Sequence, residues 1–395
     1  MIKYLITLLT AVSGWMLVSP LAWTAETTPA SAGSRAKDPA FQKQMQTAIQ
    51  RGLTWLQSGQ NSNGWWSTPD HPAVTALALT AFMGEPTEGG KRQVAPPLAK
   101  GYDFILASVK PDGGIYRAGL ANYNTSLCML ALLAAKDAKY EPILRRARAA
   151  LVALQADPST LGESNAVFAG GVGYGSNPQQ PDLNNTVTAL EALYYTRHLV
   201  RDQNTPETKD LNWDAAIRFI QNCQNLPTHN QQAWVSEDPK DRGGFIYCPG
   251  RSMAGGVTNA ATGKVALRSY GTISYAGLLS YIYADLKRDD PRVVAVLDWL
   301  RGNYTLEENP GMQMQGLYYY LHLMTKALNL CGADRLELKD GRTIDWRFEI
   351  ASRLLQLQQH EGSWANTNNR WWEKDPNLVT AYAALSLEMI ARGGR

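Results

Sequence analysis

The chain has 395 residues, of which 45% are hydrophobic and 18% are charged, and its formal net charge is +3. These values are typical of an ordinary globular protein, and they argue against a disordered chain, a fibrous chain and a nucleic-acid binder. A chain of this length can form two domains or one body built from many repeats, so internal repeats are sought first.

Residues 1–25 have the pattern of a signal peptide. Lys3 supplies a positive charge, and residues 4–25 are apolar apart from scattered Thr and Ser. A cleavage site near Ala25 is imperfect because the bulky Trp23 stands where a small residue is preferred. The alternative is an uncleaved anchor of about 20 residues. We expect a secreted or periplasmic protein that contacts a membrane only through an uncleaved N-terminus.

Residues 26–40 are rich in Thr, Ser, Ala and Pro. Such a segment cannot bury enough apolar surface to fold, so it predicts a flexible linker. The globular body is expected to occupy residues 41–395.

Two kinds of helix alternate along this body. Six segments carry apolar residues at three- and four-residue spacing, the pattern of half-buried helices: 41–58, 95–109, 142–155, 212–224, 290–303 and 345–359. Each is followed by a segment that is apolar on nearly every side. These six segments begin at Ala73, Asn124, Asn185, Thr272, Gly316 and Leu378. Because a helix that is apolar all round must be buried all round, the alternation predicts an all-α fold, the α6/α6 toroid of six helical hairpins in two concentric rings.

The turns inside the hairpins repeat a motif. Gln60, Gly64 and Trp66 have the spacing QxxxGxW, and Gln358, Gly362 and Trp364 have it again in the last hairpin. Intermediate turns keep paired glycines followed by an aromatic residue: PDGGIY from Pro111, AGGVGY from Ala169 and RGGFIY from Arg242. We expect Gly to provide the backbone conformation of the turn, Gln to satisfy a helix end and Trp to cover the junction between hairpins. The fifth turn, around Gly311, is hardly recognisable.

These turns, placed between amphipathic and all-apolar helices, resemble the QW repeats of squalene and oxidosqualene cyclases and of prenyltransferase β subunits. The resemblance covers roughly residues 41–392. It implies an α/α barrel equal in size to one squalene cyclase domain, such as the C-terminal one, or to a prenyltransferase β subunit. Since Gly and Trp hold such hairpins together with or without catalysis, the motif itself implies structure rather than activity.

The resemblance to cyclases implies a DxDD motif at the start of an inner helix, whose middle Asp protonates an alkene. The best match is DLNNT, which begins at Asp182. Asn184 stands at the proton-donor position and Asn185 follows it, and an amide cannot donate that proton. One alternative is that Asp182 or Asp375 acts as the acid from a shifted position. The other is that these residues only cap their helices.

The resemblance to prenyltransferases implies a zinc site made of an Asp-x-Cys pair and a His. Arg268 and Tyr270 stand at the Asp-x-Cys positions, and the His position falls on Tyr320, with His322 on another face of the helix. None of the first three binds zinc. We therefore expect no metal and no cofactor.

The starts of the inner helices should converge at one rim and form a cavity. Tyr faces suit an isoprenoid or a cation, Asn suits sugar hydroxyls and Arg suits an anion. The ligand-binding candidates are Tyr123, Asp182, Asn184, Arg268, Tyr270, Tyr319 and Tyr320. The alternative is that the tyrosines only fill the centre of the barrel.

Other groups are candidates through expected exposure alone. Trp65, Trp371 and Trp372 would form an aromatic platform for sugars or lipids. Glu361 and Glu373 are charged residues that a polysaccharide lyase or hydrolase would need, and Asp238, Asp241 and Arg242 are others.

The four cysteines form no CxxC pair. Export would permit a disulfide between Cys223 and Cys248, whereas Cys128 is expected to be a buried small hydrophobe. No catalytic role is expected for these residues or for Cys331.

The sequence thus predicts an exported protein similar to the cyclase and prenyltransferase repeat proteins, without their acid or zinc site, that binds an apolar (isoprenoid or lipid) or glycan ligand in its cavity. One alternative is an enzyme, either a cyclase with a displaced acid or a polysaccharide lyase or hydrolase. The other is a structural scaffold that binds a partner through a convex face or through residues 226–268.

Overall fold

The computed structural model describes residues 34–84, 96–161, 163–175, 180–200, 209–258, 260–261 and 263–393. The predicted signal peptide or anchor, residues 1–25, and residues 26–33 of the predicted linker lie outside the described residues. In the described part the chain is mostly helical, with two small antiparallel hairpins. Strand β1 (Gly256–Thr258) pairs with β2 (Val265–Leu267), and β3 (Leu336–Glu337) pairs with β4 (Thr343–Ile344).

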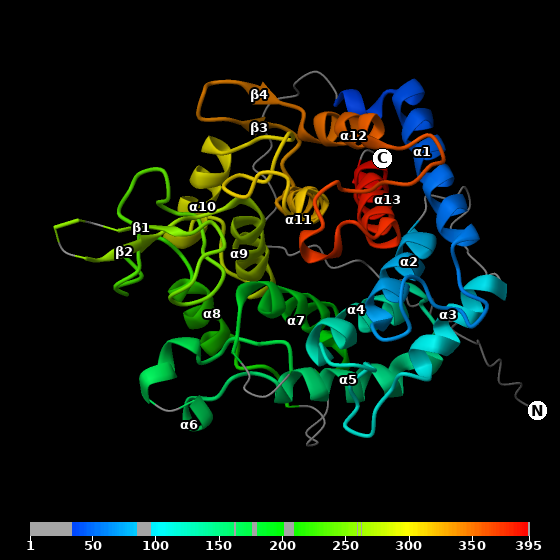
Figure 1. Cartoon of the computed structure of the whole chain (residues 1–395), viewed down its shortest axis with the longest axis horizontal. Helices are drawn as coiled ribbons and strands as arrows, with labels where there is room; N and C mark the ends of the chain where they lie inside the picture. Colours follow the sequence, from blue (N-terminus) through cyan, green and yellow to red (C-terminus); the bar gives the residue numbers. More distant parts are fainter. Residues whose placement is uncertain are drawn as a thin grey trace, which may run out of the picture.

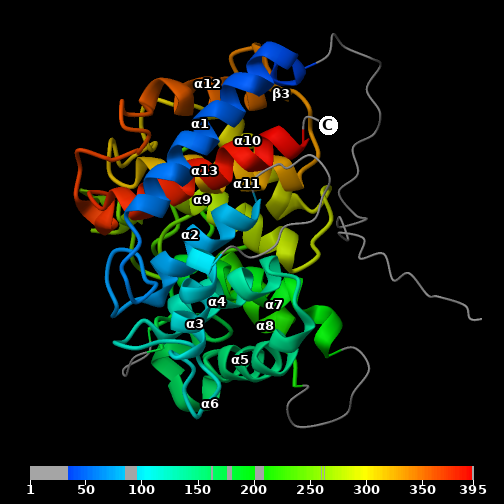
Figure 2. The same cartoon turned by 90° about the vertical axis from the view of Figure 1, so that its right-hand side faces the viewer.

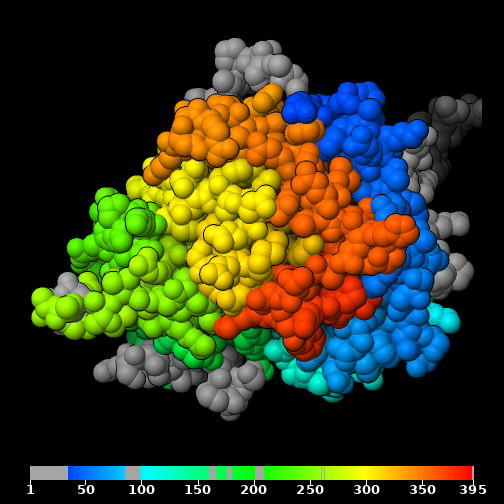
Figure 3. Space-filling view, turned by 45° about the horizontal axis from the view of Figure 1, so that its top comes forward, coloured from blue at the N-terminus to red at the C-terminus, as the bar shows by residue number. Residues whose placement is uncertain are grey.

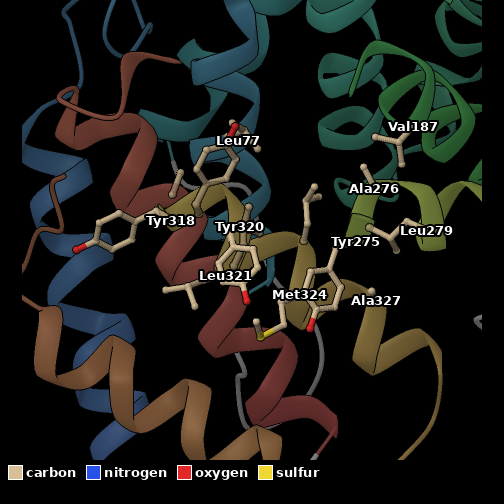
Figure 4. Packing of buried hydrophobic residues seen from close by; sticks show 14 of the residues in the cluster. Leu77, Val187, Tyr275, Ala276, Leu279, Tyr318, Tyr320, Leu321, Met324 and Ala327 are labelled. Carbon is tan, nitrogen blue, oxygen red and sulfur yellow. The ribbon is translucent and has the colours of Figure 1, made fainter. Parts of the chain in front are cut away.

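Six apolar helices surround the centre of the molecule (Figure 1). They are α2 (Pro72–Gly84), α4 (Ala121–Ala134), α7 (Leu183–Tyr195), α9 (Gly271–Tyr283), α11 (Leu317–Leu330) and α13 (Pro376–Gly393). Each contacts the next in this order, and α13 contacts α2. All thirteen residues of α9 are buried, as its all-round apolar sequence requires. Figure 4 shows this packing, in which the rings of Tyr275 in α9 and Tyr320 in α11 lie 5.7 Å apart.

Six amphipathic helices lie outside them. They are α1 (Pro39–Ser58), α3 (Pro96–Leu106), α5 (Glu141–Ala153), α8 (Trp213–Asn222), α10 (Pro291–Gly302) and α12 (Trp346–Leu357). Helix α3 packs on α2, α5 on α4, α8 and α10 on α9, and α12 on α13. Helix α1 lies along α13, so the first and last helices of the body are side by side (Figure 2). On the surface, the orange to red C-terminal part of the chain borders the blue N-terminal part (Figure 3). The remaining helical turns, such as α6 (Pro158–Leu161), lie in the connections.

The ordered body starts earlier than residue 41. A short 3-10 helix, η2 (Arg35–Lys37), precedes α1, which begins at Pro39 with Asp38 as its N-cap. The Ser34 hydroxyl and the Arg35 N–H donate to the Asp345 carboxylate at 2.8 and 2.7 Å. Residues 34–40, predicted as linker, are therefore part of the fold, because these contacts with the last outer helix compensate for their polar composition.

A glycine in five of the turns touches the backbone of the following outer helix. These glycines have φ between 90° and 103° and are Gly64, Gly113, Gly170, Gly243 and Gly362. A Cβ on any of them would overlap a backbone carbonyl: that of Lys100, Arg146, Ala215, Ala295 and Arg51, respectively. Only glycine tolerates both the left-handed backbone and this close approach. The last contact joins the final turn to α1.

Two further hydrogen bonds recur at these turns. A Gln side chain at the end of the outer helix donates to the glycine carbonyl at 2.9–3.0 Å in four of them: Gln60 to Gly64, Gln155 to Gly170, Gln224 to Gly243 and Gln358 to Gly362. A hydroxyl of the inner helix accepts a turn N–H at 2.9–3.0 Å in five, at Thr75, Thr125, Thr186, Ser274 and Thr380. The third and fourth turns thus contain the same Gln, which insertions separate from its glycine.

The fifth turn is held differently. Gly311 lies against Tyr270 rather than against an outer helix. The connection is instead attached to α12 through side chains, since Tyr304 donates to Glu349 at 3.1 Å and Arg353 pairs with Glu307 at 2.7 Å. Because side-chain contacts replace the glycine contact at the fifth turn, its sequence does not repeat the motif.

All four cysteines are free and buried, so the Cys223–Cys248 disulfide is not formed. The two segments are instead joined by backbone hydrogen bonds, including one from the Ile246 N–H to the Cys223 carbonyl at 2.9 Å. Burial raises the pKa of the Cys248 thiol to about 12, which keeps it uncharged and unreactive. None of the helices in the described ranges has both the length and the hydropathy needed to span a bilayer.

The glycine contacts predict a stability difference between two Gly→Ala variants. Gly341 also has a positive φ, 87°, but a Cβ there would meet nothing within 4 Å. The free energy of unfolding of Gly341→Ala should therefore fall by only the cost of the left-handed backbone conformation, about 1–2 kcal/mol. That of Gly362→Ala should fall by roughly 1–3 kcal/mol more, because its Cβ would lie 2.8 Å from the Arg51 oxygen. Urea unfolding of both variants measures this, and equal losses would contradict the role given to the contact.

Candidate functional site

A cavity of about 310 Å³ opens where the N-terminal ends of the six inner helices meet. This volume lies at the lower end of the range of small-molecule sites, about 300–1,000 Å³. Every inner helix contributes to its wall. The lining residues are His71, Ala73, Val74, Leu120, Tyr123, Tyr174, Asn184, Asn185, Thr188, Tyr270, Thr272, Gly316, Tyr319, Trp371, Trp372, Glu373, Leu378 and Tyr382.

Neighbouring hairpins cap one another's inner helices around this cavity. The first N–H groups of a helix have no partner within the helix. The Asn124 side chain accepts the Ala73 N–H of α2 at 3.1 Å, and the Asn309 side chain accepts the Thr272 N–H of α9 at 2.9 Å. Glu373 does the same for α11. Many polar groups at this end of the molecule are therefore structural.

Tyrosines form one wall of the cavity. The hydroxyls of Tyr123 and Tyr382 are 3.0 Å apart and share a hydrogen bond. The ring of Tyr319 lies 5.5 Å from that of Tyr382. The ring of His322 stacks on that of Tyr382, with the ring centres 5.2 Å apart. Burial raises the pKa of Tyr123 to about 12 and holds that of Tyr382 well above its usual value, so both hydroxyls are uncharged at neutral pH. Burial also holds the pKa of His322 well below its usual value, so that imidazole is neutral.

Glu373 is a structural carboxylate. It was expected to be exposed, but only 1% of it is accessible. One oxygen accepts the Tyr319 N–H at 2.8 Å, and the other accepts the Asn366 side-chain amide at 2.6 Å and the Tyr318 N–H at 3.3 Å. Burial raises its pKa, while these donors oppose the shift. The expectation failed because the helix that needs this cap belongs to another hairpin.

Asp182 lies behind the cavity wall rather than on it. Its carboxylate is the N-cap of α7, accepting the Asn185 N–H at 2.9 Å and the Asn185 side-chain amide at 2.7 Å. It is 2% exposed, and burial raises its pKa from 3.8 to about 6. The residue between it and the cavity is Asn185, so the capping role predicted as an alternative accounts for its contacts.

Three buried polar atoms on the cavity wall have no hydrogen-bond partner within the described residues. They are Nδ1 of His71, Oδ1 of Asn184 and Oγ1 of Thr272. Buried groups of this kind are normally satisfied, and leaving one unpaired costs about 1–3 kcal/mol. They are the polar atoms of the site that the fold itself does not use.

Of the seven ligand-binding candidates, Tyr123, Asn184, Tyr270 and Tyr319 line the cavity. Asp182, Arg268 and Tyr320 do not. The backbone of Arg268 follows the β1–β2 hairpin, with its N–H donating to Gly255 at 3.0 Å. The Tyr320 side chain lies about 100° further round α11 than that of Tyr319, and its hydroxyl donates to the Thr305 carbonyl at 2.9 Å instead of lining the cavity.

Some of the other candidates predicted from the sequence line the cavity, and the rest do not. Trp371 and Trp372 line the cavity, whereas Trp65 does not. Asp241 is buried and accepts from Ser236 and Ser269 at 2.9 Å, so it is a structural group. Asp238, Arg242 and Glu361 are exposed and outside the cavity wall. Within the described ranges no three His, Cys, Asp or Glu side chains are grouped closely enough to hold a metal ion.

Sequence reasoning missed several lining residues: His71, Tyr174, Thr188, Thr272 and Tyr382. A signal was present for three of them. Tyr174 is the aromatic residue of a paired-glycine turn, and His71 and Thr272 stand at the start of an inner helix. Thr188 and Tyr382 lie one turn further along their helices and are placed only by the packing.

No protein-family model matches the chain, and no curated protein matches its sequence. Solved structures do match. An inactive variant of an α-1,6-mannanase from Salegentibacter, in complex with α-1,6-mannotriose, is 13% identical with a TM-score of 0.51, covering 88% of this chain and 99% of the mannanase. A type II terpene cyclase from Scytonema is 13% identical with a TM-score of 0.50, covering 89% and 98%. The protein geranylgeranyltransferase-I of Candida albicans, complexed with GGPP, is 13% identical with a TM-score of 0.49, covering 86% and 90%. The first two similarities show that the fold is similar to that of α/α toroids.

The buried Asp182 predicts a specific pH dependence. Its folded pKa is raised, so its contribution to stability is full below pH 3.8 and is lost as the pH rises through about 6. Relative to Asp182→Asn, the free energy of unfolding of the wild type should fall by up to roughly 3 kcal/mol between pH 4 and pH 7. Chemical unfolding across this range measures the difference. Asp238→Asn, at an exposed carboxylate, is the control, and a pH-independent difference for Asp182→Asn would contradict the buried position.

Proposed function

We propose that the chain is an α6/α6 toroid, exported through its N-terminal segment, that binds an apolar or glycan ligand in the cavity at the inner-helix starts. The observation that carries the proposal is the cavity itself. Its walls are aromatic, and three of its lining residues, His71, Asn184 and Thr272, carry a buried polar atom that has no hydrogen-bond partner within the described residues. An aromatic pocket with a few convergent polar groups is the usual form of a small-molecule site.

Contacts around the molecule support the toroid. The inner helices contact one another in sequence from α2 to α13, and α13 contacts α2. Gly362 in the last turn touches Arg51 of α1 in the way that the other turn glycines touch the outer helix after them. Gln358 adds a hydrogen bond to the Ala48 carbonyl at 2.8 Å. The first and last hairpins are thus joined like any other neighbouring pair.

The groups available in the cavity favour binding over the two chemistries of the resembling families. Asn184 faces the cavity at the position of the cyclase acid, and its amide is no proton donor for an alkene. Glu373, the carboxylate of the described lining, is occupied by three hydrogen bonds. Tyr270 lines the cavity where a zinc site would need a thiolate.

A cyclase with a displaced acid is the second candidate, and Asp182 is the residue that favours it. A buried carboxyl with a pKa of about 6 is partly protonated near neutral pH. To act, it would have to exchange the Asn185 hydrogen bonds for contact with a substrate alkene. Incubation with geranylgeraniol and a search for cyclised products tests this candidate, and product formation abolished by Asp182→Asn would establish it.

A partner-binding scaffold is the third candidate, and the β1–β2 hairpin favours it. This hairpin lies within residues 226–268, and its Val257 and Val265 side chains are 46% and 45% exposed. Two exposed valines are a small surface, below the size expected of a stable protein interface. The cavity therefore remains the stronger site.

Ligand binding at the cavity predicts the effect of two matched tyrosine variants. Tyr174 lines the mouth of the cavity, while Tyr116, the aromatic residue of the preceding turn, does not. Tyr174→Ala should weaken binding of geranylgeraniol or α-1,6-mannotriose, whichever binds, about tenfold, because one aromatic face of the wall is lost. Tyr116→Ala should leave it unchanged.

Titration followed by tryptophan fluorescence measures both affinities, and native mass spectrometry of protein purified from its own host identifies a bound lipid or glycan. If neither probe binds and no ligand copurifies, the proposed function is wrong. Equal effects of the two variants would place the site elsewhere.

A further inference from the structure

Two adjacent tryptophans at the cavity mouth have an unusual conformation. Trp371 and Trp372 have φ values of 55° and 65°, which bulky side chains rarely adopt. Both side chains line the cavity, yet 40% of Trp371 and 47% of Trp372 is exposed. Strain of this kind persists only where the surroundings hold it, and it is concentrated at functional sites.

The next residue holds the two tryptophans in place. Glu373 is fixed to the first turn of α11 by the N–H groups of Tyr318 and Tyr319, and Asn366 closes the loop through the Glu373 carbonyl at 3.0 Å. The Trp371 ring lies against Gly316, where a Cβ would approach it to 3.0 Å. The Trp372 ring lies 5.1 Å from that of His71. The indoles are thus fixed as part of the cavity mouth, although they gain little burial there.

The same cavity is lined by His71, Asn184 and Thr272, whose buried Nδ1, Oδ1 and Oγ1 atoms have no hydrogen-bond partner among the described residues. An isoprenoid chain offers no hydrogen bond, so these atoms would stay unpaired beside it, which costs free energy. A ligand that carries both flat apolar faces and several hydroxyls would use the indoles and the polar atoms together. A pyranose ring has this combination.

The charges of the lining residues indicate whether the ligand is charged or neutral. The lining residues include no Lys or Arg, and the Glu373 carboxylate is already satisfied. A charged sugar would therefore find no counter-ion at the wall of the cavity. The occupant that fits is uncharged.

We propose that the cavity mouth is a subsite for a neutral sugar ring, which stacks on Trp372 and hydrogen-bonds Asn184 and Thr272. This inference rests on the proposed function and selects the glycan over the apolar ligand. It assigns to the paired tryptophans the role of selecting a sugar.

The test uses the full chain and four neutral trisaccharides: α-1,6-mannotriose, cellotriose, maltotriose and chitotriose. Isothermal titration calorimetry should detect binding of at least one. Trp372→Ala should weaken it about tenfold or more, since a stacking face is lost. Thr272→Val, which replaces the hydroxyl by a methyl group of similar size, should weaken it about threefold to tenfold.

Two controls separate a lost contact from a damaged fold. Trp65→Ala removes a tryptophan outside the cavity wall, and Thr325→Val removes a buried hydroxyl of α11 that is already bonded to the Leu321 carbonyl at 2.8 Å. Both should bind the trisaccharide within twofold of the wild type. Geranylgeraniol affinity of Thr272→Val should be unchanged or higher, because the variant lines the cavity with one more apolar group.

The outcomes distinguish this inference from the proposed function. If geranylgeraniol binds and none of the trisaccharides does, the sugar subsite is wrong while the ligand-binding proposal stands. If a trisaccharide binds and neither Trp372→Ala nor Thr272→Val weakens it, the subsite is also wrong. If no probe binds and no ligand copurifies from the host, both proposals fail.

Discussion

Each hairpin is held to the next by backbone contact at its turn, and the rest of the structure depends on this contact. At five turns a glycine with a positive φ lies against a carbonyl of the following outer helix, and the contact of Gly362 with Arg51 joins the end of the body to its beginning. Backbone segments can approach this closely only where no Cβ intervenes. The spacing of the outer helices, and hence the position of the inner helices they cover, is therefore set by a few glycines as well as by the core side chains.

This arrangement has a consequence for the site. All the inner helices begin at the same end, so their unpaired N–H groups collect there. Asn124, Asn309 and Glu373 satisfy such groups on inner helices of neighbouring hairpins. A polar residue near the cavity is accordingly a structural cap unless its partners show otherwise. Asn184 and Thr272 are the informative cases, because both residues line the cavity and the fold gives their buried side-chain oxygens no partner among the described residues.

The turns and the helix order follow the pattern of an α/α toroid, and the carboxylates of Asp182 and Glu373 beside the cavity are helix caps. Solved structures of similar fold include a type II terpene cyclase and an α-1,6-mannanase. Because one fold carries different activities in these proteins, function depends on the residues of the site rather than on the framework.

The sequence by itself determined which segments are helices, which of them are buried and where the turns lie, because these follow from local periodicity and from Gly, Gln and Trp at fixed spacing. It did not show that Gln155 and Gln224 repeat the role of Gln60, since insertions separate each from its glycine. It placed Tyr123, Asn184, Tyr270 and Tyr319 at the cavity, but it could not exclude Arg268 and Tyr320 or reveal Glu373 as a cap of α11. The positions of Arg268 and Tyr320 depend on which face of an element meets which neighbour, and that of Glu373 depends on a partner 54 residues away in the chain. Only the packing of one hairpin against another decides them.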